Sequence, residues 1–478
     1  MLETLKRWML PLGPVLATVL AIVAYRAGLS LPASICAWVA FVCASWWIFE
    51  CVHIAVAGLV PLAVFPIAGV LTETQAASSY GHPMILLLLG GSFLSAAMES
   101  VGAHRRIALS MVQLVGGRGG KRIVLAFMLA TAALSMWISN TASTLMMLPI
   151  ALAVLSQANN ETLRVPMLLG IAYAASIGGM STPIGTPPNV MFMGQIERQF
   201  GIEFGFGQWM AIAVPIVAVL LPSVWWFVTR KVEIGEPIIV PEPGPWRTSE
   251  RRVLYVFALT ALAWIFRTGP AGGWSGWLPS VGGDKSLIGD TTVAIAASLI
   301  LFVCPRGDGD GDSAGDGNGD QRRRRLLDWA AANKAPWGIL IMFGGGLCLA
   351  DGFEKTGLSA TIGAQLSVFE GAPPWMIIAA VCLIVTFMTE ITSSTATASL
   401  LLPILGELAI ATDLPPAAIM IPGVISASCA FMLPVATAPN AIVFSAGGIK
   451  THEMARVGLL INLYAVIVIS TACVWLLT

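Results

Sequence analysis

Long apolar stretches without a charged residue are the feature that most constrains this chain. Residues 9–25, 210–229 and 457–477 are three examples. Each is long enough to cross a hydrocarbon core about 30 Å thick, which takes roughly 20 helical residues. Hydrophobic residues make up 56% of the 478 residues and charged residues only 11%, a balance outside the range of soluble globular domains. The chain is therefore predicted to be an all-α polytopic membrane protein.

Apolar runs bounded by turn and charge signals predict about eleven transmembrane helices. They lie near residues 9–25, 33–50, 53–71, 83–101, 165–182, 207–229, 252–267, 287–304, 335–352, 416–432 and 457–477. Two further apolar segments, 121–156 and 374–411, are too long for one helix and carry polar residues partway along. Each is predicted to form a re-entrant helical hairpin, which enters and leaves the membrane on the same face.

Lysines and arginines gather on one side of these predicted crossings. With the N-terminus inside, all but five of the 26 basic residues fall on the inner side. The exceptions are Arg26, Arg198, Arg267, Lys285 and Lys355. Because short loops rich in Lys and Arg stay in the cytoplasm, we expect a cytoplasmic N-terminus, an exterior C-terminus and a place in the bacterial inner (plasma) membrane. The formal net charge of zero gives no sign of a nucleic-acid partner.

Three sequence patterns occur twice, in the same order. "SNTASTLMMLPI" at 139–150 returns 254 residues later as "SSTATASLLLPI", and the segment that begins at Leu89 returns from Phe343 at the same offset. "TPIGTPPNVMF" from Thr182 returns 251 residues later as "LPVATAPNAIVF" from Leu433. An odd number of predicted crossings separates equivalent points, so we expect the second copy to be inverted across the membrane.

Inverted repeats with interrupted helices are typical of secondary transporters, whose binding site lies near the membrane midplane. Non-helical backbone at that depth is tolerated only beside a cavity or inside the protein. A broken helix offers N–H groups to an anion and C=O groups to a hard cation such as sodium. The predicted helix-break residues are Pro187, Pro188, Asn189, Pro439 and Asn440.

The repeat divides the chain into four predicted segments. They are an N-terminal transmembrane helix at 1–32, a first repeat at 33–230 with its hairpin at 121–156, a cytoplasmic linker at 231–251, and a second repeat at 252–478 with its hairpin at 374–411. Within the second repeat, residues 305–325 alternate aspartate with glycine and end in arginines. This loop lacks the glycine and glutamate positions of a calcium-binding EF-hand, so we expect it to be disordered.

Four motifs carry a resemblance to a known family. They are "SNTA" at 139–142, "AYAASIGGMSTPIGTPPN" at 172–189, "TEITSSTATASLLLPI" at 389–404 and "PVATAPNAIVFSAG" at 434–447. With them the chain resembles the divalent-anion/sodium symporter family, the sodium-coupled carriers of dicarboxylates, citrate and sulfate. The resemblance runs from about residue 45 to the C-terminus. It implies a homodimer in which each protomer has a scaffold domain and a transport domain that moves as an elevator.

The resemblance also implies the binding residues. The first sodium site would use Ser135, Ser139, Asn140 and the backbone of Gly185, and the second Thr389, Thr392, Ser394 and the backbone of Ala436. The substrate carboxylates would contact Asn140, Thr141, Thr186, Ser394 and Thr395. The family has Ser-Asn-Thr in both copies, whereas the second copy here reads Ser393-Ser394-Thr395. The second sodium site and the second carboxylate contact therefore lack an amide group.

Glu390 follows the first arm of the second predicted hairpin, and an ionisable group at membrane depth is a functional candidate. Two interpretations are open: a proton-coupling carboxylate, or a structural carboxylate that accepts from nearby N–H groups or hydroxyls. The second is preferred. The four histidines and eight cysteines have no spacing that indicates a metal site or a catalytic nucleophile. We therefore expect no enzyme activity and no cofactor, with sodium as the coupling ion.

These observations predict a transporter that imports a small divalent anion with sodium, most simply a C4-dicarboxylate such as succinate, malate or fumarate. The expected partners are the dianion, sodium, the lipid bilayer and a second copy of the chain. Sodium-coupled sulfate or citrate transport and sodium-independent dicarboxylate exchange are the alternatives. An intramembrane hydrolase would need a nucleophile with a base at mid-depth, which the sequence does not offer. A channel would have no use for an inverted pair of anion-binding breaks.

Overall fold

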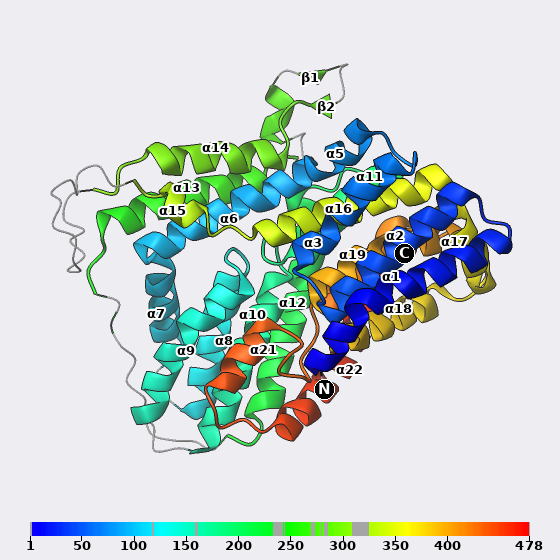
Figure 1. The fold of residues 1–478 in the computed structure, drawn as a ribbon. Helices are drawn as coiled ribbons and strands as arrows, with labels where there is room; N and C mark the ends of the chain where they lie inside the picture. The colour runs from blue at the N-terminus through cyan, green and yellow to red at the C-terminus, as the bar shows by residue number, and fades with distance from the viewer. Residues whose placement is uncertain are drawn as a thin grey trace.

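Regular structure in the described part of the chain is helical, apart from one short pair of strands. A computed structural model describes residues 2–116, 119–157, 161–232, 242, 244–268, 273–278, 280–281, 285–307 and 325–477. The strands β1 (Ser280–Val281) and β2 (Lys285–Ser286) are two residues each and lie at the edge of the molecule (Figure 1). The loop predicted to be disordered, 305–325, falls almost wholly outside the described residues.

Seven helices in the described part are long and apolar enough to cross a membrane. They run over Lys6–Arg26, Leu31–Phe49, Glu73–Val101, Phe206–Thr229, Trp337–Thr356, Ser394–Ala411 and Thr451–Leu477. All but Ser394–Ala411, an arm of a predicted hairpin, coincide with predicted crossings. The protein is thus a polytopic helical membrane protein.

Two of the other predicted crossings are shorter or interrupted. Residues 53–71 form two helices, α3 (Ile54–Gly58) and α4 (Val60–Ile67), with Pro61 in the first turn of α4. Proline fits a first helical turn but cannot continue the preceding ladder of hydrogen bonds, so the chain breaks there. The crossing expected at 287–304 is α14 (Asp290–Val303), whose 14 residues rise about 21 Å.

The order of helices in the first sequence copy recurs in the second. The first copy contains α6 (Pro83–Val101), α7 (Ala103–Val115), α8 (Gly120–Ser135), α9 (Asn140–Gln157), α10 (Arg164–Gly179), α11 (Pro187–Phe200) and α12 (Phe206–Thr229). The second contains α16 (Trp337–Thr356), α17 (Leu358–Leu366), α18 (Pro374–Thr389), α19 (Ser394–Ala411), α20 (Pro416–Ala427), α21 (Ala438–Ser445) and α22 (Thr451–Leu477). The bounds of α18 and α19 are those of α8 and α9 displaced by 254 residues, the offset of the sequence repeat.

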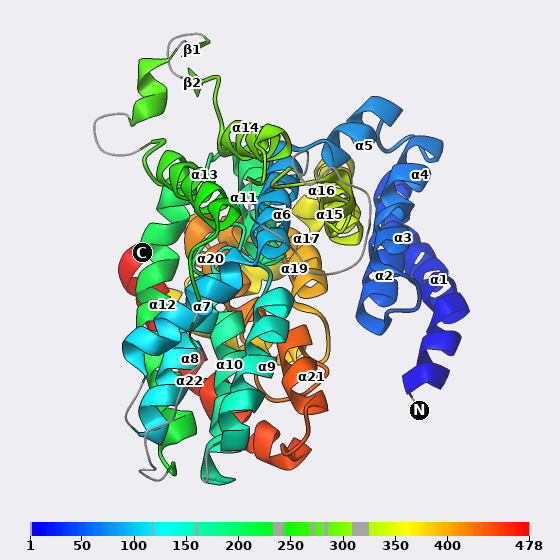
Figure 2. The same cartoon turned by 90° about the vertical axis from the view of Figure 1, so that its left-hand side faces the viewer.

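The remaining helices precede or join the two copies. They are α1 (Leu2–Arg26), α2 (Leu31–Phe49), α5 (Glu73–Tyr80), α13 (Thr248–Ile265), α15 (Trp329–Ala332) and the 3-10 turn η3 (Trp274–Trp277). Two further 3-10 turns, η1 (Glu161–Leu163) and η5 (Ser367–Phe369), lie within the first and the second copy. Figure 2 shows α1 to α4 as a column beside the rest, and α2, α3 and α4 pack against α16. A Cβ at Gly345 would lie 2.4 Å from the carbonyl oxygen of Gly58, so glycine permits the close approach of α16 to α3.

A serine starts the second arm of each hairpin. The Ser139 hydroxyl accepts from the N–H of Ala142 at 3.2 Å, and the Ser393 hydroxyl accepts from the N–H of Ala396 at 3.2 Å. Such N-caps satisfy N–H groups that the first helical turn leaves unpaired. The polar run inside each apolar segment is therefore the place where one helix ends and the next begins.

The two copies pack against each other through their later helices. Helix α10 contacts α21, and α11 contacts both α19 and α20. The pair α8 and α9 packs on α10, as α18 and α19 pack on α20. These contacts bring the ends of both hairpins toward the interrupted helices that follow them.

Candidate functional site

Each copy contains an interrupted helix after its hairpin. In the first, α10 ends at Gly179 and α11 begins at Pro187, and in the second, α20 ends at Ala427 and α21 begins at Ala438. Pro187 stands in the first turn of α11, where its missing N–H and fixed φ are tolerated. Helix α11 was not among the predicted crossings, which ended this segment at residue 182.

The two asparagines after the prolines bridge these breaks. The Asn189 amide donates to the carbonyls of Gly179 and Thr182 at 3.1 and 2.7 Å. The Asn440 amide donates to the carbonyls of Ala430 and Leu433 at 2.9 and 3.1 Å. Both asparagines are fully buried. The carbonyls of Thr182 and Leu433 also accept from the backbone N–H groups of Gly185 and Ala436. Each amide thus adds a donor to the carbonyl oxygens of its break and links the two ends of the interruption.

Three oxygen atoms meet at the first hairpin tip. The Ser135 hydroxyl lies 2.6 Å from Asn140 Oδ1 and 2.7 Å from the carbonyl oxygen of Ala175. A hydroxyl has one proton, so it donates to only one of these acceptors at a time. A Cβ at Gly179 would lie 2.4 Å from Asn140 Oδ1, so the glycine makes room for the amide. Such a group of uncharged oxygens is the chemistry that a hard cation takes.

The second tip is built from threonine hydroxyls. Thr389 donates to the carbonyl of Val385 at 2.8 Å and Thr392 to that of Met388 at 3.0 Å. The hydroxyls of Thr392 and Thr397 lie 2.5 Å apart, and Thr397 is fully buried. Sequence reasoning missed Thr397, although it stands 254 residues after Ser143 within the repeated motif.

Glu390 takes the arrangement of a structural cap. Its carboxylate accepts from the backbone N–H groups of Met432 and Leu433 at 2.9 and 3.0 Å. It also accepts from the amide of Asn462 at 2.7 Å. Three N–H donors thus stabilise the carboxylate and hold the second break against α18 and α22.

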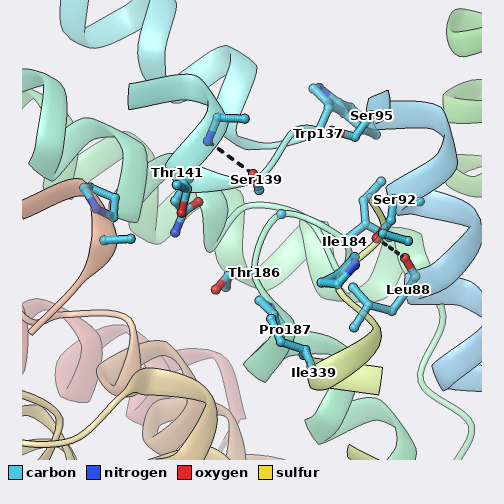
Figure 3. Close-up of a pocket in the computed structure, with 18 of the residues that line it drawn as sticks. Leu88, Ser92, Ser95, Trp137, Ser139, Thr141, Ile184, Thr186, Pro187 and Ile339 are labelled. Atoms are coloured by element: carbon cyan, nitrogen blue, oxygen red, sulfur yellow. Dashed lines mark hydrogen bonds between the residues drawn. The ribbon is translucent and has the colours of Figure 1, made fainter. Parts of the chain in front are cut away.

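One cavity of about 940 Å³ joins the two tips and the two breaks. Of the predicted site residues, those that line it are Ser139, Asn140, Thr141, Gly185, Thr186, Pro187, Ser394, Thr395, Ala436 and Pro439. Those outside its lining are Ser135, Pro188, Asn189, Thr389, Thr392 and Asn440. In Figure 3, Thr141 and Thr186 point toward the same open space. Ser92 and Leu88 of α6 lie beside Ile184, which belongs to the break between α10 and α11. The structure therefore brings both copies of the polar motif to one cavity.

Several lining residues were not among the predicted site residues. Ser92 and Ser95 come from α6, Lys334 follows α15, and Ser176 and Ser428 come from the interrupted helices. Serines at such places are common in membrane helices, where they bond to a carbonyl one turn back, so their types alone do not mark a site.

Three of the residues that line the cavity have ionisable side chains. Glu99, at the end of α6, and Lys334 both line the cavity, together with His104. Burial holds the pKa of His104 below its usual range, so this imidazole is neutral at pH 7. Around the tips and breaks, the lining side chains are hydroxyl, amide and apolar groups. An anion bound there would meet neutral donors and helix N-termini.

Comparison with known proteins identifies the family to which this chain belongs. The citrate transporter family model matches residues 44–414. A sodium-dependent dicarboxylate transporter, SdcS, from Staphylococcus saprophyticus is 39% identical over 448 residues, covering 89% of this chain and 82% of that protein. The protein of the same name from Staphylococcus aureus (strain USA300) is 38% identical over the same shares.

One solved structure has a similar fold. The Alcanivorax borkumensis YdaH transporter superposes with a TM-score of 0.59 at 15% identity, covering 84% of this chain and 87% of that one. At this identity the likeness concerns the fold alone. The sequence relatives, which span most of the chain, decide the family: this chain belongs to the divalent-anion/sodium symporter family.

Proposed function

We propose that this protein is a secondary transporter that imports a C4-dicarboxylate such as succinate, malate or fumarate together with sodium. The observation that carries the proposal is the single cavity on which both polar hairpin tips and both helix breaks converge. The relatives described above are sodium-dependent dicarboxylate transporters, which supports the same substrate and coupling ion.

The anion-binding side of the proposal rests on the N-termini of α9 and α19. These helices begin at Asn140 and Ser394, and both residues line the cavity. A helix N-terminus presents free N–H groups and a partial positive charge to an anion. Two such termini at one cavity suit a molecule with a carboxylate at each end, and the hydroxyls of Thr141, Thr186 and Thr395 are the side-chain donors beside them.

The sodium sites follow from the oxygen groups at the tips. In the first copy we assign sodium to Ser135, Ser139, Asn140 and the backbone of Gly185, where three oxygens share one hydroxyl proton. In the second copy we assign it to Thr389, Thr392, Ser394 and the backbone of Ala436. A dianion is costly to hold in an uncharged site within the membrane, and bound cations offset that cost. Sodium binding would therefore raise the affinity for the dianion, and by linkage the dianion would raise the affinity for sodium.

We further propose the orientation and the mode of movement. The basic residues support a cytoplasmic N-terminus, and then the end of the cavity with Glu99, His104 and Lys334 faces the cytoplasm. The hairpins and interrupted helices would form a transport domain, and α1 to α6 with α13 to α16 a scaffold that pairs with a second copy. The resemblance to the family supports this elevator arrangement and the homodimer.

Uptake into proteoliposomes tests the proposal. The purified protein should take up labelled succinate with saturation when a sodium gradient points inward. Replacing sodium with potassium, or using liposomes without protein, should abolish the uptake. Unlabelled malate and fumarate should compete more strongly than citrate or sulfate. Saturable uptake without sodium would contradict the coupling, and no saturable uptake of any dianion would contradict the carrier.

A further inference from the structure

Two buried hydroxyls in the cavity have no partner. Ser176 is 2% exposed and Ser428 is 4% exposed, and both line the cavity. Within the described residues, neither side-chain oxygen has a hydrogen-bond partner. A buried polar group is normally paired, because leaving it unpaired costs stability. Two unpaired hydroxyls on the wall of one cavity therefore point to a ligand that pairs with them.

These two serines lie where the two copies meet. The Tyr173 hydroxyl donates to the carbonyl of Phe431 at 2.8 Å, and the two rings pack with their centroids 5.0 Å apart. Ser176 is three residues after Tyr173 on α10, and residues so spaced share a helix face. Ser428 is three residues before Phe431, at the end of α20. The Tyr173–Phe431 contact thus holds the part of α10 that carries Ser176 against the segment that follows Ser428.

Most of the groups already assigned to the substrate carboxylates lie at the hairpin tips, on α9 and α19, and the exception is Thr186 at the start of α11. The serines belong to other elements, α10 and the end of α20, where the two interrupted helices adjoin. With one carboxylate at each tip, the carbon chain between them lies in the cavity that both serines line. A methylene group there would leave both hydroxyls unpaired, whereas a hydroxyl group on the chain can donate to one and accept from the other.

We propose that Ser176 and Ser428 bind the hydroxyl group of a 2-hydroxy C4-dicarboxylate, so that the carrier prefers malate to succinate. This inference rests on the proposed function. The physical reason for the preference is that a site with polar groups placed for a substrate hydroxyl discriminates against the analogue that lacks it.

The test compares Ser176→Ala, Ser428→Ala and the double variant with the unaltered protein. Inhibition of labelled succinate uptake by unlabelled malate and by unlabelled succinate gives the ratio of their affinities. The ratio should favour malate in the unaltered protein and fall about three- to tenfold in the variants, through weaker binding of malate. The removed hydroxyls have no protein partner, so the alanine variants should fold.

Ser426→Ala is the matched control. Ser426 is fully buried two residues before Ser428, but it does not line the cavity. Its variant should keep the unaltered ratio. A second measurement does not depend on transport: malate should raise the melting temperature of the purified protein more than succinate does, and the alanine pair should remove that difference.

Three results would overturn the inference. One is an unchanged malate-to-succinate ratio in variants that still transport with sodium. Another is an equal loss of affinity for both dianions together with a higher sodium requirement, which would assign the serines to a cation. The third is a loss of the ratio in Ser426→Ala as well. Absence of sodium-dependent uptake by the unaltered protein would instead overturn the proposed function, and this inference with it.

Discussion

The two copies of the site differ at two positions that correspond through the repeat. In the first copy, Asn140 Oδ1 occupies the space that a Cβ at Gly179 would fill. The positions that correspond by the repeat offsets of 254 and 251 residues are Ser394 and Ala430. The second copy thus has a shorter polar side chain, Ser394 in place of asparagine, and one more methyl group, Ala430 in place of glycine. We interpret Ser394 and Ala430 as a complementary pair, in which the methyl group takes the volume that the amide leaves.

This interpretation predicts an interaction between two substitutions. Ser394→Asn alone should lower stability by about 1–3 kcal/mol, because the larger side chain overpacks against Ala430. Ser394→Asn combined with Ala430→Gly should recover most of that loss, since the glycine makes the room that Gly179 makes in the first copy. The melting temperatures and sodium-dependent uptake of both single variants and the double variant check it. Strictly additive effects would show that the two residues are independent.

At the scale of elements, the two breaks are held in different ways. In the first copy, the Thr182 hydroxyl donates to the carbonyl of Met136, and in the second, the corresponding positions are Leu433 and Glu390. There the donor is the backbone N–H of Leu433 and the acceptor is the Glu390 carboxylate. Both copies therefore have a hydrogen bond between hairpin and break at the same position of the repeat. The donor and acceptor groups differ, and in the second copy the acceptor is Glu390.

Glu390→Gln separates the structural interpretation from proton coupling. The amide keeps one acceptor oxygen but turns an NH₂ group toward N–H donors, so we expect a loss of about 1–3 kcal/mol of stability. Because Glu390 serves as a cap, sodium-driven uptake by the variant should keep the pH profile of the unaltered protein. Thermal unfolding and uptake across a pH series provide the measurement. A variant of unaltered stability that no longer responds to pH would identify Glu390 as a proton carrier.

At the scale of the whole molecule, an ion pair ties the second half of the first broken helix to α16. Arg198, near the end of α11, pairs with Asp351 of α16 through two guanidinium nitrogens. Ser79 of α5 donates to Asp351 at 2.7 Å and accepts from Arg198 at 3.2 Å. The three side chains connect an element of the proposed transport domain to two elements of the proposed scaffold. If the domains move relative to each other, this contact has to separate.

Removing one residue of the Arg198–Asp351 pair should lower the stability of the fold more than replacing both residues. Arg198→Ala leaves the Asp351 carboxylate largely buried without its cation, a loss of about 3–5 kcal/mol. Arg198→Met with Asp351→Leu replaces the pair by apolar contact and should restore most of the stability. Melting temperature and uptake check both variants. Lys6→Ala is the control, because the Lys6–Glu50 pair is exposed and should be worth at most about 1 kcal/mol. Equal losses in the single and double variants would contradict the pairing.

Much of the helical structure could be predicted from the sequence, because it depends on local signals. Charge-free apolar runs mark long helices such as α12 and α22, and the polar residues within 121–156 and 374–411 mark the interruptions before α9 and α19. Local signals failed where a helix is short or polar. Helix α11, which carries Gln195, Arg198 and Gln199, lacks the apolar character of a crossing and was not predicted as one.

The sequence by itself determined that the protein lies in a membrane, that its polar motif occurs twice and that both copies are tied to proline-marked breaks. Each of these depends on composition or on order along the chain. Only the tertiary structure decided which polar groups meet: Ser135 with Asn140 and Ala175, Glu390 with the N–H groups of the second break, and Ser176 with Ser428 at one cavity. The physical reason is that hydrogen-bond partners and cavity walls come from segments far apart in the chain, 272 residues for Ser79 and Asp351, and their pairing follows from how the helices pack.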